Sequence, residues 1–424
     1  MTYGVKAIDS QYALAAAPQD SDSSSLSIAL IIVGGTIGFG VFLIAAQIGG
    51  SLGLVQAATA IALGCSVLGL LGAATSYIGA RTRLSTYLLT QFTFGTQGAK
   101  LINVIVALSL IGWYAVICNY IGQTSRQVLL DGLGLDVHPY AMVLLASGLM
   151  IYVTIKGFTG IDRLAFYLVP VMVAFLVFAA YRSWVLVAEA PAAPLNLFTF
   201  STAVSAVVGT YIAGAIIQPD YSRFAKSVRG STVAVYLALG VVYPVILLVS
   251  SVPSILFGDV DLLRVLGLLG LVLPAFVLLF FGAWSSNVLC LYSSSLSLAT
   301  VNALWPLKRI ILSIGVVGTA AAYFPVETYL IDFLVILGVT IPPIGAIYLL
   351  EGYRCRFRFD LAELSQGPSV RPFALLVWLF SSMFGYFVEK SDGFDLTGVA
   401  SLDALLAAVV VFGAFAVSNR QTGH

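Results

Sequence analysis

The chain has 424 residues, of which 60% are hydrophobic and 9% are charged, and its formal net charge at pH 7 is +1. Soluble globular domains carry roughly a quarter charged residues, so this composition excludes a soluble domain and is typical of a membrane protein. The mean hydropathy of +1.02 agrees with that assignment. We expect no nucleic-acid partner, and oligomeric state is not readable from these quantities.

The first segment, residues 1–25, is polar and rich in serine, aspartate and alanine. No basic stretch precedes a short apolar core, so we predict a disordered cytoplasmic tail and not a cleaved signal peptide. One of the serines Ser23 to Ser25 is expected to cap the first helix, because a serine hydroxyl accepts a hydrogen bond from the first turn.

Twelve stretches follow that are apolar enough to cross a bilayer, which takes about 20 residues in a helix. They are centred on residues 26–48, 54–80, 101–123, 137–155, 164–187, 198–218, 231–257, 268–297, 309–324, 326–350, 372–388 and 397–417. With the N-terminus inside, 16 lysines and arginines fall in inner segments and 4 in outer ones. Positive charge favours the cytoplasmic side, so both termini are predicted in the cytoplasm of a plasma-membrane (inner-membrane) protein.

Two of these stretches contain similar glycine interruptions, and aligning Gly35-Thr36 with Gly209-Thr210 gives an offset of 174 residues. Matched interruptions point to a transporter's binding site, because unwound backbone frees peptide groups for substrate and ion. The alternative is that glycine only lets helices pack closely. Pro170 falls opposite Pro342-Pro343 at a similar offset, which favours five-plus-five inverted repeats over a six-plus-six arrangement. The predicted parts are repeats at 26–190 and 195–351, a cytoplasmic loop at 352–371, helices 11–12 at 372–417 and a tail at 418–424.

The middles of helices 1, 3, 6 and 8 hold no Asp, Glu, Lys, Arg or His. A proton relay of titratable groups is therefore hard to build, and so is the base, nucleophile or metal set of an enzyme. The four cysteines lack metal or redox spacing and are expected to be packing groups. We expect no cofactor, a neutral or zwitterionic substrate, and a coupling ion held by neutral oxygens.

Helix 8 supplies such oxygens, because the hydroxyls of Ser285 and Ser286 lie one turn beyond the carbonyl of Gly282. Facing them, the carbonyls of Gly38 and Val41 are expected to be free where helix 1 unwinds. Five oxygens of this kind suit sodium. The alternative is that both serines bond back to carbonyls one turn earlier in their own helix.

Aromatic side chains complete the candidate site. Trp113 lies in the middle of helix 3, away from the interfaces where tryptophan usually collects, and Tyr211 lies in the interrupted helix 6. Two such rings can hold a flat heteroaromatic ligand while Asn287 reads its polar edge. For a lone tryptophan the alternative is packing.

Several motifs resemble those of the nucleobase–cation symporter family, and within it the cytosine permease branch. They are Gln218-Pro219-Asp220-Tyr221-Ser222-Arg223-Phe224, Tyr77-Ile78-Gly79-Ala80-Arg81-Thr82 with Phe92 to Gly95, Ile111-Gly112-Trp113-Tyr114, Trp284-Ser285-Ser286-Asn287 with Leu291-Tyr292, and Ile341-Pro342-Pro343-Ile344-Gly345. Each motif is modest, but together they run in the family's order over roughly residues 26–355.

The resemblance implies twelve helices in the LeuT-type inverted-repeat fold, with helices 1 and 6 broken, and sodium-coupled uptake of a nucleobase or related ring. It implies that Trp113 stacks on the substrate and that Asn287 binds it. It also places the sodium site at Gly38, Val41, Gly282, Ser285 and Ser286.

The chain departs from the cytosine permease pattern at several positions. Tyr211 stands for a phenylalanine, Leu110 for a glutamine and Ala213 for a serine, while Gly282 stands for an asparagine. Val288 and Leu289 stand for an Asp and an Asn. A pocket that has lost polar groups relaxes its recognition, so a purine, a substituted pyrimidine or a vitamin precursor fits as well as cytosine.

The sequence therefore predicts a sodium-coupled symporter for a nucleobase-like heterocycle, working by alternating access with helix 10 gating near Pro342-Pro343. Proton-coupled or uncoupled transport, and a sensor or channel with the same fold, remain the alternatives. For Asp220 and Arg223, just after helix 6, two interpretations stay open: a salt bridge at an inner gate, or a solvated loop end.

Overall fold

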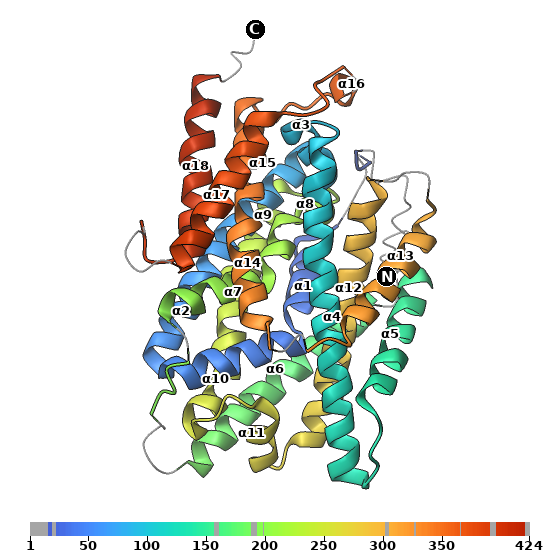
Figure 1. The fold of residues 1–424 in the computed structure, drawn as a ribbon, viewed down its shortest axis with the longest axis vertical. Coiled ribbons are helices and arrows are strands. Elements are labelled where there is room, and N and C mark those ends of the chain that lie inside the picture. The colour runs from blue at the N-terminus through green and yellow to red at the C-terminus, as the bar shows by residue number, and fades with distance from the viewer. Residues whose placement is uncertain are drawn as a thin grey trace.

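The computed structural model describes residues 16–18, 23–156, 161–187, 193–197, 199–301, 305–325, 328–364, 366–390 and 396–419. Within these residues the regular secondary structure is helical, and the one isolated β-bridge joins Ser23 to Ala225. Figure 1 shows the helices running mostly along the long axis of the molecule, with α3 and α16 at one end and α11 at the other.

The first half of the chain begins with a helix that ends early and then resumes. Its helices are α1 (Ser25–Thr36), α2 (Phe39–Thr82), α3 (Thr86–Phe94), α4 (Gly98–Leu133), α5 (Pro139–Lys156) and α6 (Ile161–Leu186). The Ser24 side chain accepts a hydrogen bond from the Ser27 amide, as a serine cap should. At Gly53, where φ is +71°, α2 bends sharply, so α2 carries the end of span 1 and all of span 2.

The second half and the two appended helices follow the same plan. The helices are α7 (Phe200–Ile216), α8 (Pro219–Ser222), α9 (Val228–Leu237), the π-helical segment η3 (Ala238–Val242), α10 (Tyr243–Phe257), α11 (Leu262–Leu268), α12 (Val272–Ala299), α13 (Leu307–Ala321), α14 (Leu330–Thr340), α15 (Pro342–Arg354), α16 (Leu361–Leu364), α17 (Pro372–Lys390) and α18 (Ala400–Ser418). The segments α9, η3 and α10 are continuous and together form one predicted span, and α14 and α15 form another. With these segments joined, the helices follow the predicted spans. Eight helical segments of the described residues are long and apolar enough to cross a membrane unaided.

Span 1 is interrupted within its predicted glycine motif, whereas span 6 is not interrupted at the glycine predicted for it. Span 1 breaks at Ile37 and Gly38, after Thr36 has ended α1. Span 6 stays helical through Gly209 and is interrupted only at the turn after Ile216. Gly209 serves close packing, because a Cβ there would collide with the backbone oxygen of Leu334 on α14.

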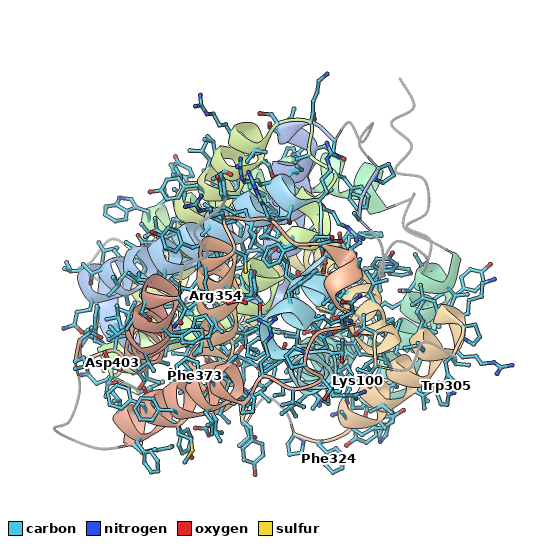
Figure 2. All side chains as sticks on the ribbon, turned by 90° about the horizontal axis from the view of Figure 1, so that it is seen from above. Lys100, Trp305, Phe324, Arg354, Phe373 and Asp403 are labelled. Carbon is cyan, nitrogen blue, oxygen red and sulfur yellow. The ribbon has the colours of Figure 1, made fainter. Side chains whose placement is uncertain are left out.

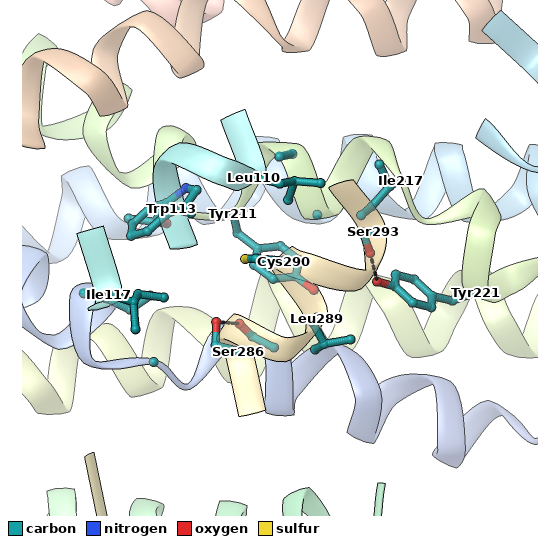
Figure 3. A pocket seen from close by; sticks show the side chains of 17 residues that line it. Leu110, Trp113, Ile117, Tyr211, Ile217, Tyr221, Ser286, Leu289, Cys290 and Ser293 are labelled. Atoms are coloured by element: carbon teal, nitrogen blue, oxygen red, sulfur yellow. Dashed lines mark hydrogen bonds between the residues drawn. The ribbon is translucent and has the colours of Figure 1, made fainter. Parts of the chain in front are cut away.

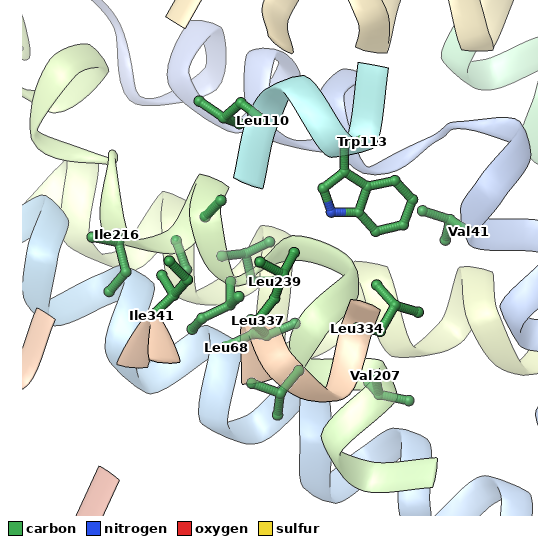
Figure 4. Close-up of a cluster of buried hydrophobic side chains, with 14 of the residues drawn as sticks. Val41, Leu68, Leu110, Trp113, Val207, Ile216, Leu239, Leu334, Leu337 and Ile341 are labelled. Atoms are coloured by element: carbon green, nitrogen blue, oxygen red, sulfur yellow. The ribbon is translucent and has the colours of Figure 1, made fainter. Parts of the chain in front are cut away.

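The helices pack in two groups. In the first, α2 packs extensively against α7, α9 and α10, and in the second α4 packs against α5, α12 and α13. Between the groups lies a buried apolar cluster that includes Leu68, Leu110, Trp113, Leu239 and Leu334 (Figure 4). The outer surface is apolar as well, and Trp305 and Phe324 stand at its rim in Figure 2. Such a surface suits a lipid environment.

The end of the molecule that carries α3 and α16 is rich in arginine, and we call it the basic face. Part of the predicted disordered tail is ordered there: the Ala17 amide donates to the Arg83 carbonyl at 2.9 Å, and Arg83 donates to the Pro18 carbonyl at 2.6 Å. The Lys226 amide donates to the Ser23 carbonyl at 3.0 Å. The rest of the predicted tail, residues 1–15 and 19–22, lies outside the described residues.

Candidate functional site

A cavity lies where span 1 is interrupted. The space at this position, part of which is open to the outside, is about 620 Å³. Its walls come from the α1–α2 break, α4, α7 and α12, so both halves of the chain contribute. Figure 3 shows Trp113, Tyr211, Ser286 and Cys290 around this space. The lining residues include no Asp, Glu, Lys, Arg or His, so the cavity is suited to a neutral ligand.

Glycines position the two aromatic rings of the cavity. A Cβ on Gly40 would lie 2.9 Å from Cζ3 of Trp113, so only glycine allows the indole to rest against span 1. A Cβ on Gly214 would lie 2.6 Å from Cζ of Tyr211. The Tyr211 hydroxyl in turn lies 3.2 Å from the place of a Cβ on Gly35. The glycine-rich motifs therefore make room for aromatic side chains as well as interrupting a helix.

Four of the five predicted substrate residues line the cavity: Leu110, Trp113, Tyr211 and Ala213. Asn287 does not belong to the lining. Its amide nitrogen donates to the Tyr114 carbonyl at 3.2 Å, and it lies 3.3 Å from the sulfur of Cys118. The amide nitrogen thus links α12 to α4, whereas Oδ1 of Asn287 is buried and has no hydrogen-bond partner among the described residues.

Three of the five predicted sodium residues, Gly38, Gly282 and Ser286, lie at the contact between the α1–α2 break and α12. The Ser286 hydroxyl lies 3.5 Å from the Gly35 carbonyl and 3.4 Å from the place of a Cβ on Gly38. A Cβ on Gly282 would lie 3.0 Å from the Ile37 carbonyl oxygen. The C-terminal end of α1, with its partial negative charge, thus faces α12.

Two details of this contact bear on the predicted ion ligands. The Ser285 hydroxyl is buried and has no hydrogen-bond partner among the described residues, as expected of a group that serves a ligand. The Gly38 carbonyl already accepts the Val41 amide at 3.0 Å, so it begins α2. Val41 lies in that first turn and lines the cavity. Among the described residues, no three or more His, Cys, Asp or Glu side chains form a group that could hold a metal ion.

The end of the cavity toward the basic face is closed by hydroxyl groups. The Tyr221 hydroxyl, on α8, hydrogen-bonds that of Ser293, on α12, at 3.2 Å (Figure 3). The Tyr87 hydroxyl donates to the Ser293 carbonyl at 3.1 Å. This closure links α3, α8 and α12 and was not predicted, although Tyr221 belongs to a quoted motif.

Asp220 and Arg223 flank that closure and are buried, with exposed fractions of 6% and 0%. The Thr86 amide donates to Asp220 at 2.9 Å. The Arg223 guanidinium lies over the Phe224 ring at 4.7 Å. A solvated loop end is therefore excluded for these two residues, and they belong to the packed region between α3 and α8.

At the other end, span 10 approaches Trp113. The span divides at Ile341, and Pro342 and Pro343 begin α15, because proline lacks the amide hydrogen that would continue α14. On α14, Phe333 meets Trp113 edge-on with ring centroids 6.1 Å apart. The predicted gate segment thus lies against the predicted stacking residue, although neither proline lines the cavity.

Other lining residues escaped the sequence interpretation, notably Gly40, Ile117, Cys290 and Ser293. Glycine, isoleucine, cysteine and serine are all common in membrane helices, so residue type alone did not mark these positions as part of a binding site. The helical spacing of Ser286, Cys290 and Ser293 places them on one face of helix 8, which is the signal that was available.

The family model that describes permeases for cytosine/purines, uracil, thiamine and allantoin matches residues 19–363. The chain belongs to this family. It is 24% identical to the cytosine permease of Escherichia coli (strain K12), over 98% of this chain and 96% of that protein. The permease family identifies a membrane transporter and not an enzyme, and the resemblance stated from the motifs is confirmed.

Solved structures agree on the fold. A closed conformation of Mhp1, a nucleobase-cation-symport-1 family transporter with bromovinylhydantoin bound, superposes with a TM-score of 0.81 at 19% identity and covers 96% of each chain. The inward-facing conformation of Mhp1 gives 0.78 at 17% identity and covers 95% of each chain. A Na⁺-coupled sialic acid symporter gives 0.64 at 13% identity, with 98% of this chain and 92% of that one covered. The protein therefore has the predicted LeuT-type inverted-repeat fold.

Proposed function

We propose that this permease is a sodium-coupled symporter that carries a neutral, nucleobase-like heterocycle into the cell. The observation that carries the proposal is the position of an uncharged aromatic cavity next to oxygen groups at the break in span 1. The ring binds between Trp113 and Tyr211, and sodium binds beside Ser285 and Ser286. The bromovinylhydantoin bound to Mhp1 and the names of the curated relatives support a heterocyclic substrate.

Loss of polar groups from the cavity wall bears on the choice of substrate. Leu110 and Ala213 present only carbon atoms to the ligand, whereas Tyr211 adds a hydroxyl. A less polar ring, such as a purine, a substituted pyrimidine or a vitamin precursor, therefore fits at least as well as cytosine. Asn287 remains a candidate contact only if α12 rotates during the cycle.

Coupling follows if sodium and substrate favour the same conformer. Sodium at the α1–α12 contact draws the end of α1 toward Ser285, and this movement shapes the cavity wall that holds the ring. Span 10, hinged at Pro342 and Pro343, closes over Trp113 through α14. The basic face is cytoplasmic in this proposal, as the positive-inside rule requires, and the protein lies in the plasma membrane.

The test is thermal stabilisation of the purified protein by a panel of nucleobases and related rings, each in sodium and in potassium. A ring that stabilises far more in sodium supports both sites and their coupling. Equal stabilisation in the two salts removes the sodium site and leaves the heterocycle. Failure of every ring would contradict the substrate class.

Uptake into proteoliposomes separates the remaining alternatives. A sodium-free pH series tests proton coupling, because a proton-driven permease would transport equally well without sodium. Accumulation against a gradient distinguishes a symporter from a channel or a sensor.

A further inference from the structure

The connection from α15 to α17, residues 355–371, crosses the basic face and is tied down at both ends. At its start, Glu351 is 2% exposed and accepts hydrogen bonds from Nε and Nη2 of Arg354, each at 2.7 Å. At its end, Nη1 of Arg371 donates to the same carboxylate at 2.7 Å. Charge-assisted bonds of this length are strong, so Glu351 joins the two ends of the connection.

The end of the connection is also bound to the turn that begins α4. The Gln97 amide donates to the Ser369 carbonyl at 2.7 Å, and the Arg371 amide donates to the Phe94 carbonyl at 2.9 Å. Gly95 has φ of +81°, and a Cβ there would lie 2.7 Å from the Ser369 oxygen. Only glycine suits this position, so the turn is shaped to receive the connection.

The start of the connection is bound to α2 and α3. Phe357 meets Tyr77 of α2 edge-on with centroids 5.4 Å apart, and the Arg81 guanidinium lies 5.9 Å from the Phe357 ring. Phe359 packs on Phe92 of α3 at 4.8 Å. Because α3 packs against α4, the contact that reaches the α2 group is the one that Phe357 makes with Tyr77 and Arg81.

The connection therefore joins the α2 group to the α4 group at the basic face. Alternating access requires the two groups to move relative to one another there, because Tyr221 of α8 and Ser293 of α12 are hydrogen-bonded across this end of the cavity. Such a movement must stretch or break either the contacts of Phe357 or the bonds of residues 369–371. The restraint acts at the basic face only, because the connection does not reach the opposite end of the molecule.

We propose that Glu351 and Arg371 are positioning residues that hold the two helix groups together at the basic face, and so set how often the cavity opens there. This inference rests on the proposed alternating-access function, and it does not depend on the identity of the substrate or ion. Arg354 keeps Glu351 paired when Arg371 is absent, so the restraint can be weakened without leaving a buried charge alone.

The test uses the protein's own Cys290, which lines the cavity, as a reporter of opening. Cys65 and Cys118 are fully buried, and Cys355→Ser removes the remaining thiol near this face. A membrane-impermeant maleimide is added to inverted vesicles and to intact cells without substrate. We expect Arg371→Gln to raise the labelling rate of Cys290 from the basic face about fivefold, because the lost bond is charge-assisted but Arg371 is partly exposed and water weakens the interaction.

Arg358→Gln is the matched control, because Arg358 is an exposed arginine of the same connection. It is expected to label like the parent. Phe357→Ala loosens the other attachment without changing charge, and it should raise labelling in the same direction. Parental labelling rates in both folded variants, Arg371→Gln and Phe357→Ala, would overturn the proposal.

If the proposed function is wrong, the same labelling experiment gives a different result from the one expected if the restraint is wrong. Protection of Cys290 by a ring in the parent tests the substrate site, whereas labelling without ligand tests the restraint. Faster labelling of Arg371→Gln together with no protection by any ring would keep the restraint and reject the substrate class. Faster labelling from both faces would indicate general loosening, and it would contradict a restraint specific to the basic face.

Discussion

The hydroxyl of Tyr211 lies 3.2 Å from the place that a Cβ on Gly35 would occupy. These residues belong to the two glycine motifs of the two repeats, so the motifs meet at the cavity. The contact explains why a glycine occupies the last turn of α1: a side chain there would push against a ring that forms the cavity wall. The same reasoning extends to Gly40 and Trp113, and it yields a direct test.

We expect Gly40→Ala to weaken ring binding about tenfold, because the added methyl would lie 2.9 Å from Trp113 and overpacking costs about 1–3 kcal/mol. Calorimetric titration with the ring chosen by thermal stabilisation measures the effect. Gly148→Ala is the control, since a Cβ there has nothing within 4 Å. Parental affinity in Gly40→Ala would show that Trp113 does not hold the ring.

Ser285→Ala should abolish the sodium-specific part of thermal stabilisation. Because the Ser285 hydroxyl is buried without a partner among the described residues, its removal should leave stability in potassium unchanged or slightly raised. Ser295→Ala, on the same helix, removes a hydroxyl that donates to the Leu291 carbonyl at 2.6 Å and serves as the control. Sodium-specific stabilisation that survives in Ser285→Ala would place the ion elsewhere.

Leu110→Gln tests the loss of polar groups from the cavity. A buried amide without a partner costs about 1–3 kcal/mol, so the melting temperature without ligand should fall. A ring with a polar edge, such as cytosine, should recover part of that loss and bind about tenfold more tightly than to the parent. Differential scanning fluorimetry with cytosine and with a less polar ring measures both effects. Equal responses to the two rings would argue against a contact at this position.

Phe333→Ala should speed dissociation of the bound ring, about tenfold, because the side chain covers Trp113 from α14. Stopped-flow quenching of tryptophan fluorescence follows the release. Ile336→Ala, at an exposed position of the same helix, is expected to release the ring at the parental rate. A release rate that Phe333→Ala does not change would mean that α14 is not the gate.

Asn287→Ala should lower stability by about 1–2 kcal/mol even without a ligand, because it removes the hydrogen bond to the Tyr114 carbonyl that links α12 to α4. Denaturation of the ligand-free protein measures this loss. Parental stability combined with weaker ring binding would instead support the direct substrate contact predicted from the motif.

Sequence alone determined the membrane class, the positions of the spans, the break in span 1 and part of the cavity wall, including Leu110, Trp113 and Tyr211. The length of an apolar stretch, the placement of charges and the positions of glycines are local properties of the chain. They can be interpreted without knowing which residues pack against them. The neutral character of the site was readable for the same reason, since charged residues are simply absent from those spans.

The tertiary structure decided the features that depend on how each helix packs. These features follow from the face that a helix turns toward its neighbour. The tertiary structure turned Asn287 toward Tyr114, buried Asp220 and Arg223, and kept span 6 helical at Gly209. It also folded the α15–α17 connection across the basic face, where Glu351 meets Arg371. Each of these outcomes rests on contacts between residues far apart in the chain, whose free energy depends on the packed partner and not on local residue type.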